Sequence, residues 1–333
     1  MSFNEGAQLD PSQVEDRRGS SGGGMGRGGK AGIGIGGALI LLIGGYFGIN
    51  SGLLNGIVGA LDGGQTQQEQ LPASNGAANQ CKTGADANKK LDCRITATAN
   101  SLNAFWPSYL KQVGATYTPI KTVIFSGSTN TACGPASTEV GPFYCPGDKK
   151  AYFDPAFFQE LVDRFGSSGG QLAQEYVVAH EFGHHIQDIL GSIGNAQNDP
   201  QGPASGSVRV ELQADCYAGI WMRDASTTKD PQSGQPFLAQ STQKDLADAL
   251  SAASSVGDDR IQKAATGRTN PESWTHGSSA QRQKWLTAGY QSGDINKYLC
   301  TGTALTRPHP YKRILANHSA LSSGIACCRR IFG

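Results

Sequence analysis

The pattern of hydrophobic and polar positions divides the chain into a polar beginning, an uncharged apolar stretch and a patterned region that starts near Cys81. In the patterned region, apolar residues recur at helical spacing in several segments. The predicted helices cover about 88–112, 155–165, 171–190, 207–224, 241–266 and 278–290. Short runs of β-branched and aromatic residues predict strands at 121–125 and 150–154. Because the strands precede most of the helices, we expect an α+β fold.

The apolar stretch 31–49, AGIGIGGALILLIGGYFGI, carries no charge. As a helix it would reach about 28 Å, close to the ~30 Å hydrocarbon core of a bilayer. Its glycines disfavour a buried water-soluble helix, and no signal-peptide cleavage site follows, so we predict a single N-terminal transmembrane helix. Its G-x-x-x-G pairs would allow a weak homodimer through this anchor. The preceding cations predict a cytoplasmic N-terminus and an extracytoplasmic remainder; they are Arg17, Arg18, Arg27 and Lys30.

Composition completes the predicted domain plan. Residues 1–30 are polar and rich in Gly and Ser, which predicts a disordered cytoplasmic segment. Residues 50–80 have the composition of a flexible linker, and residues 81–303 form the predicted folded domain. Of the 45 glycines, 19 fall between residues 19 and 64, so the excess is local and excludes a collagen-like repeat. Residues 304–333 form a basic tail.

The charge balance and the cysteines limit the partners and the kind of metal site that the chain can have. The chain has 28 Lys and Arg against 27 Asp and Glu, which removes the electrostatic case for a nucleic-acid partner. Eight cysteines allow 105 pairings, so sequence alone leaves the disulfide map open. The pairs Cys81–Cys93 and Cys133–Cys145 are the first candidates, because each would close a short loop in an oxidising compartment. No C-x-x-C spacing favours a cysteine zinc site.

The sequence HEFGH at 180–184 is the most informative motif. His180 and His184 are four residues apart, so on a helix they share one face and can bind one metal ion, with Glu181 beside them as a candidate general base. The alternatives are an exposed histidine-rich helix or core histidines satisfied by hydrogen bonds, but two histidines at this spacing with the intervening glutamate favour zinc. His185 lies about 100° around the helix from His184 and is expected to pack or cap.

The predicted helix 207–224 supplies a candidate third ligand. Glu211 and Asp215 lie four residues apart, and they resemble the pair of the thermolysin-like gluzincin peptidases. In that group a glutamate binds zinc and an aspartate hydrogen-bonds a ligand histidine, an arrangement that orients the ring. Two carboxylates on a solvated face are the alternative. The apolar residues around this pair predict a buried helix, where unpaired carboxylates are costly, so we favour the ligand interpretation.

Further motifs are similar to those of a known family. They are VEDRRG (14–19), GPFYCPGDKKAYFD (141–154), VVAHEFGHHIQ (177–187), ELQADCYAG (211–219) and THGSSAQR (275–282). Together they resemble the neutral zinc metallopeptidase family of bacterial membrane-anchored proteins, the YpfJ-like group, over about residues 14–300. The resemblance implies a zincin-like domain with a small sheet and an active-site helix. Family members end near residue 300, so the tail 304–333 is of doubtful origin, either a membrane-surface tether or a non-native extension.

His276 is the candidate oxyanion donor. Thermolysin-like enzymes have such a histidine after the ligand glutamate, and this resemblance implies a hydrogen bond from His276 to the substrate oxyanion. The alternative is a helix cap, because Ser278 or Ser279 can cap the helix that follows. Weaker candidates for substrate contacts are Tyr144, Arg260 and Arg282.

The motifs together predict a zinc-dependent metalloendopeptidase of envelope or extracytoplasmic proteins. One catalytic Zn²⁺ held by His180, His184 and Glu211 would activate a water, and Glu181 would accept its proton. We expect a peptide or protein substrate, added as a strand beside residues 150–154. Two alternatives stay open: a non-catalytic envelope scaffold or binding protein stabilised by zinc, and a cell-wall zinc amidase.

Overall fold

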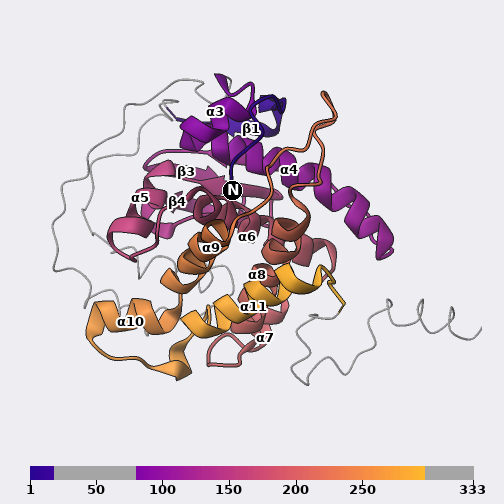
Figure 1. Ribbon diagram of the computed structural model, residues 1–333. Coiled ribbons are helices and arrows are strands. Elements are labelled where there is room, and N and C mark those ends of the chain that lie inside the picture. Colours follow the sequence, from indigo (N-terminus) through magenta and orange to yellow (C-terminus); the bar gives the residue numbers. More distant parts are fainter. Residues whose placement is uncertain (19–79, 297–333) are drawn as a thin grey trace, which may run out of the picture. The chain divides into compact units, whose positions relative to one another are not determined.

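The computed structural model describes residues 1–18 and 80–296, which form one folded unit (Figure 1). Helices and two small sheets make up this unit, so the α+β prediction is confirmed. The predicted anchor 31–49, the linker up to residue 79 and the tail 304–333 lie outside the described residues. Within the two described ranges, no helix has the length and apolar character that a membrane crossing requires.

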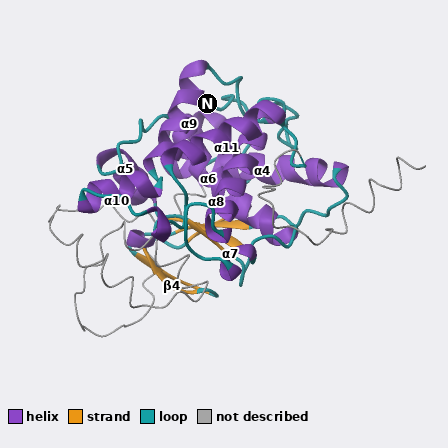
Figure 2. Ribbon diagram, turned by 90° about the horizontal axis from the view of Figure 1, so that it is seen from below, coloured by secondary structure: helices purple, strands orange, loops and turns teal. Residues whose placement is uncertain are grey.

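A four-stranded mixed sheet lies at one side of the unit, and most helices lie at the other (Figure 2). Its strands, in spatial order, are β1 (Val14–Asp16), β2 (Lys121–Ile124), β6 (Lys150–Phe153) and β5 (Phe143–Cys145). β1 and β6 both run parallel to β2, and β5 is antiparallel to β6. The order makes β5 an edge strand of the described sheet and gives β6 a partner on each side.

A separate two-stranded hairpin, β3 (Ser128–Thr131) and β4 (Gly134–Ser137), follows β2. Both predicted strands are confirmed as β2 and β6. The disulfide Cys133–Cys145 joins the turn of this hairpin to the end of β5, and Cys81–Cys93 closes the other predicted loop. Both candidate disulfides are therefore confirmed.

The predicted helices occur in the predicted order, but α3 and α7 were not predicted and one predicted helix is divided in two. Their bounds are α3 (Gly84–Lys89), α4 (Leu91–Gln112), α5 (Pro155–Asp163), α6 (Gln171–Ile189), α7 (Asn195–Asn198), α8 (Gly206–Asp224), α9 (Gln243–Ser255), α10 (Asp258–Thr266) and α11 (Ser279–Ser292). The prediction of one helix over 241–266 is wrong, because the chain bends between α9 and α10 at Gly257. A Cβ atom on Gly257 would lie 2.3 Å from the Ser279 nitrogen. The lack of a side chain at Gly257 therefore lets α11, which begins at Ser279, lie close to this bend.

Helix α6 lies at the centre of the fold, where it contacts α4, α8 and α9. It crosses α8 at Gly183, where an added Cβ would lie 2.9 Å from the carbonyl oxygen of Ala214. The absence of a side chain at Gly183 therefore lets the helix that carries both candidate ligand histidines approach the helix that carries Glu211. Helix α11 also packs on α8, and Gly277 in the loop before α11 lies close to Val208 and Leu212 of α8.

Residues 1–18 belong to the fold, so the prediction of disorder over residues 1–30 is wrong for this part. Phe3, Ala7 and Leu9 are buried, and β1 adds a strand to the sheet. The composition of the segment is too polar for it to fold alone. The rest of the domain supplies the apolar surface against which its few hydrophobic side chains are buried.

Burial of Glu175 on α6 predicts a pH dependence of the free energy of unfolding, which tests the fold. Burial raises the pKa of its carboxyl to about 7, against the opposing charges of the Met1 α-amino group and Arg94. An unfolded glutamate titrates near ~4.3, so between about pH 4.5 and 7 the folded chain keeps a proton that the unfolded chain releases. This group therefore lowers the free energy of unfolding as pH rises through that window, by up to about 3 kcal/mol.

We expect Glu175→Gln to remove this contribution. The free energy of unfolding of the variant, relative to wild type, should increase from about pH 4.5 to about pH 7 and then level off. Chemical denaturation at several pH values measures this difference. A difference that stays constant over the whole range would show that Glu175 does not keep its proton in the folded protein.

Candidate metal centre

The structure brings together the three side chains that the sequence proposed as ligands. The Nε2 atom of His180 lies 3.1 Å from Oε2 of Glu211, and the Nε2 atom of His184 lies 3.5 Å from Oε1 of the same carboxylate. One donor atom from each residue lies within 4.8 Å of the others. Two imidazoles from α6 and one carboxylate from α8 therefore converge on one point.

The second nitrogen of each histidine is held by a different partner. Nδ1 of His180 lies 2.9 Å from Oδ1 of Asp215, as the resemblance to the gluzincin pair implied. Nδ1 of His184 lies 2.8 Å from the side-chain oxygen of Gln187, which the sequence analysis did not identify. The Gln187 amide in turn donates to the carbonyl oxygen of Val210 on α8. Both rings are thus fixed with Nε2 directed at Glu211, the geometry that metal-binding histidines need.

Arg282 on α11 completes the surroundings of Asp215. Its Nε donates to Oδ2 of Asp215 at 2.9 Å and its Nη2 to Oδ1 at 3.0 Å, while the Tyr176 hydroxyl donates to Oδ1 at 2.5 Å. Arg282 is only 3% exposed, so its guanidinium is the buried counter-charge that this buried carboxylate requires. Arg282 also lines the pocket, so its predicted contact with substrate stays a prediction. The structure adds a second role, because Arg282 positions Asp215 and, through it, His180.

The charges of the cluster suit a divalent cation. The neighbouring histidines outweigh burial and hold the pKa of Glu211 well below its usual range, so it is an anion. Burial lowers the pKa of His184 to about 4, so its imidazole is neutral at pH 7 and can offer a lone pair. For His180, burial is outweighed by Asp215 and Glu211, which raise its pKa to about 9, so a bound cation would replace a proton there. Two imidazoles and one carboxylate form a ligand set that zinc enzymes use.

Glu181 lies in the same pocket as the three side chains but is not part of their cluster. It is 7% exposed, and burial raises the pKa of its carboxyl to about 7. The charge of His180 and the backbone of Tyr144 on β5 oppose this effect of burial. A general base with a pKa near the working pH is well suited to proton transfer.

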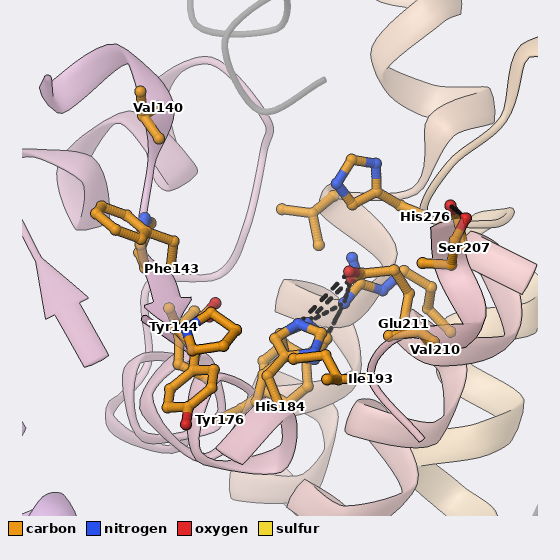
Figure 3. Close-up of a pocket in the computed structure, with 18 of the residues that line it drawn as sticks. Val140, Phe143, Tyr144, Tyr176, His184, Ile193, Ser207, Val210, Glu211 and His276 are labelled. Carbon is orange, nitrogen blue, oxygen red and sulfur yellow. Dashed lines mark hydrogen bonds and ion pairs between the residues drawn. The ribbon is translucent and has the colours of Figure 1, made fainter. Parts of the chain in front are cut away.

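His276 faces the pocket from the loop before α11 (Figure 3). Its Nδ1 lies 3.2 Å from Oδ1 of Asp258, whose Oδ2 accepts the backbone N–H groups of Thr275, His276 and Gly277. Its Nε2 is buried and has no hydrogen-bond partner within the described residues. Burial lowers the pKa of His276, but Asp258 outweighs this effect and raises it, which favours a cationic donor. Ser278 caps α11 separately, so the two interpretations of this loop are compatible.

The pocket of about 120 Å³ around these groups is mainly apolar. Phe143 and Tyr144 of β5 lie on one side, and Glu211 and His276 lie on the other (Figure 3). The Tyr144 hydroxyl donates to Asp188 and meets Nδ1 of His185 at 3.0 Å. His185 is therefore a packing residue outside the ligand cluster, as expected.

Two expectations about substrate contacts are corrected. Arg260 is exposed on α10 and does not line the pocket. Residues 150–154 cannot accept an added strand, because β6 is already paired on both sides, with β2 and β5. The free edge beside the pocket belongs to β5.

A helical H-E-x-x-H motif, a carboxylate from a second helix and an edge strand beside the pocket are together typical of zinc-dependent hydrolases with this motif. Comparison with known proteins supports this resemblance to zinc-dependent hydrolases. The family model "Putative neutral zinc metallopeptidase" matches residues 4–301, and the chain belongs to this family.

Two relatives illustrate the similarity. An uncharacterized protein of Mycobacterium tuberculosis is 56% identical over 245 residues, which cover 72% of this chain and 82% of that protein. The uncharacterized protein YpfJ of Escherichia coli is 37% identical over 291 residues, covering 84% of this chain and 92% of YpfJ. No solved structure matches the chain.

Asp258 gives a prediction about His276. Asp258→Asn removes the negative charge that raises the pKa of His276, so we expect kcat to fall by roughly 10- to 100-fold and the alkaline limb of its pH profile to move to lower pH. Asp259→Asn is the matched control, because Asp259 lies on the same turn and accepts from Ser279 instead. A pH profile of Asp258→Asn with the wild-type alkaline limb would contradict the assignment.

Proposed function

We propose that the protein is a zinc-dependent metalloendopeptidase. The observation that carries this proposal is the convergence of His180, His184 and Glu211 on one point of a pocket that also contains Glu181. A site that only stabilises the fold usually has four protein ligands and needs no adjacent base. Three ligands with a buried carboxylate beside them fit a catalytic zinc site better than a structural one.

The proposed chemistry divides between the metal and the chain. Zinc, when bound by these three side chains, supplies a Lewis acid that polarises the scissile carbonyl and lowers the pKa of a water molecule. Glu181 accepts a proton from the attacking water and passes it to the leaving amine. His276, through Nε2, donates a hydrogen bond to the oxyanion, while Asp258 holds its other nitrogen.

The substrate backbone is proposed to pair with β5. This strand has a free edge within the described sheet, and its residues Phe143 and Tyr144 line the pocket that contains Glu181. An extended peptide on this edge would gain backbone hydrogen bonds, and its side chains would meet the apolar wall that includes Phe143. Unfolded or flexible protein segments are therefore the expected substrates.

Two disulfides in one small domain favour an oxidising compartment, so we propose proteins of the cell envelope as the substrate pool. The apolar stretch 31–49 is proposed to keep the enzyme at a membrane.

The test compares substrates and metal dependence in one experiment. The purified full-length protein is incubated with an unfolded protein and, separately, with peptidoglycan fragments, and the products are identified by mass spectrometry. We expect peptide-bond cleavage of the unfolded protein, loss of cleavage with a chelator and recovery on adding Zn²⁺. Cleavage of peptidoglycan amide bonds alone would instead identify an amidase. Stoichiometric zinc without any turnover would identify a scaffold.

A further inference from the structure

The N-terminal segment is joined to the domain by backbone pairing at several points. Val14–Asp16 pair in parallel with residues 122–124 of β2. Further upstream, the Leu9 N–H donates to the carbonyl oxygen of Lys82 at 2.9 Å, and the Gly84 N–H donates to that of Ala7 at 2.9 Å. Residues 1–18 thus contribute to the sheet and also lie along the start of α3.

Side-chain burial shows that this segment is integral to the domain. Phe3 is 2% exposed, Ala7 is fully buried and Leu9 is 4% exposed. Asn100 on α4 accepts the Asp10 N–H and donates to the Asp10 carbonyl oxygen, at 2.8 and 3.0 Å. Removing the segment would expose these apolar surfaces and leave buried polar groups without partners.

The segment's two arginines are engaged in ion pairs with the fold. Arg18 contacts Asp16 at 2.7 Å and Asp92 of α4 at 3.2 Å. Arg17 contacts Glu15 at 2.8 Å and donates to the carbonyl oxygen of Asn130 on β3. These arginines are two of the four cations from which a cytoplasmic N-terminus was predicted. Their charges are balanced within the domain, which weakens that prediction.

Strand pairing limits how the chain can be arranged around a membrane. Paired strands lie about 4.8 Å apart, whereas a bilayer's hydrocarbon core is about 30 Å thick. Residues 14–16 and 122–124 therefore lie on one side of any membrane. A single crossing between residues 18 and 80 would place them on opposite sides, so the predicted orientation is incompatible with this sheet.

The disulfides indicate on which side of the membrane these paired segments lie. The Cys81–Cys93 bridge lies next to the segment's docking site: Lys82 follows Cys81 and pairs with Leu9, and Asp92 precedes Cys93 and contacts Arg18. Disulfides form and persist outside the cytosol. We propose that residues 1–18 and 80–296 fold together in one disulfide-forming compartment, and that the chain between them begins and ends on the same side of the membrane. This proposal does not rest on catalytic activity.

Cysteine labelling of the full chain tests the proposal. The parent carries serine in place of Cys300, Cys327 and Cys328, and Cys216, which lies outside the two disulfides described above, is buried. Glu5→Cys reports on the N-terminal segment and Lys111→Cys, at the end of α4, reports on the domain; both positions are exposed. Ser12→Cys, also exposed, repeats the N-terminal measurement if Glu5→Cys disturbs folding.

Spheroplasts are treated with a membrane-impermeant maleimide before and after lysis, with a cytosolic protein as the control for intact membranes. We expect the N-terminal and domain cysteines to label to the same extent before lysis, and lysis to add nothing. Labelling of Glu5→Cys only after lysis, with Lys111→Cys labelled before it, would overturn the shared side. Labelling of both only after lysis would overturn the disulfide-forming compartment.

Discussion

Glu181→Gln is expected to lower kcat/KM for an unfolded protein substrate by about 10³-fold while zinc remains bound. Glutamine keeps the shape of the side chain but cannot accept a proton from water. The loss should appear in kcat, because the carboxylate acts on the attacking water. Hydrolysis rates and zinc content, measured on the same preparations, check both parts of this prediction.

Glu175→Gln is the matched control for that variant. Both glutamates are buried on α6, but Glu175 lies outside the pocket, so the same substitution there should leave kcat/KM near the wild-type value. If Glu181→Gln also kept near wild-type activity, Glu181 would not be the base. An equal loss in both variants would point to damage of α6 instead of lost chemistry.

Glu211→Ala is expected to weaken zinc binding by more than about 100-fold. Loss of an outer partner of a metal ligand typically costs 10- to 100-fold in affinity, and Glu211 is proposed as a ligand itself. Asp215→Asn, which changes only the partner of His180, should give the smaller loss. Competition with a zinc chelator of known affinity measures both constants, and it does not depend on turnover.

Glu272→Ala serves as the control for Glu211→Ala, since Glu272 is exposed and lies away from the pocket. Its zinc affinity should equal that of wild type. Wild-type affinity in Glu211→Ala would exclude this carboxylate from the metal site. Activity should fall with zinc occupancy, so excess zinc is expected to restore it in Asp215→Asn.

The helices that form the site could be predicted because their signals are local. The spacing of His180 and His184 and the apolar positions of α6 lie within one helix, and the structure begins and ends α6 within a residue of the prediction. The strands were harder to predict because each of the six described strands is only three or four residues long. β4 also contains Gly134 and Pro135, residues that normally argue against a strand.

The partners that orient the candidate site residues could not be predicted because they are distant in sequence. Arg282 is 67 residues from Asp215, and Asp258 is 18 residues from the His276 backbone N–H that it accepts. Their roles follow from how α10 and α11 pack, which no local pattern encodes. The N-terminal segment shows the same limit: its composition indicates disorder, yet Phe3 and Leu9 are buried by a domain that follows more than 60 residues later.

The metal content and ligand set of the purified full-length protein test the proposed zinc site most directly. Elemental analysis should find about one zinc ion per chain. The zinc X-ray absorption spectrum should show only nitrogen and oxygen ligands, with the scattering pattern of two imidazoles at the ~2.0–2.1 Å distance usual for zinc and histidine. Absence of zinc, or sulfur ligands near ~2.3 Å, would contradict a site built from His180, His184 and Glu211.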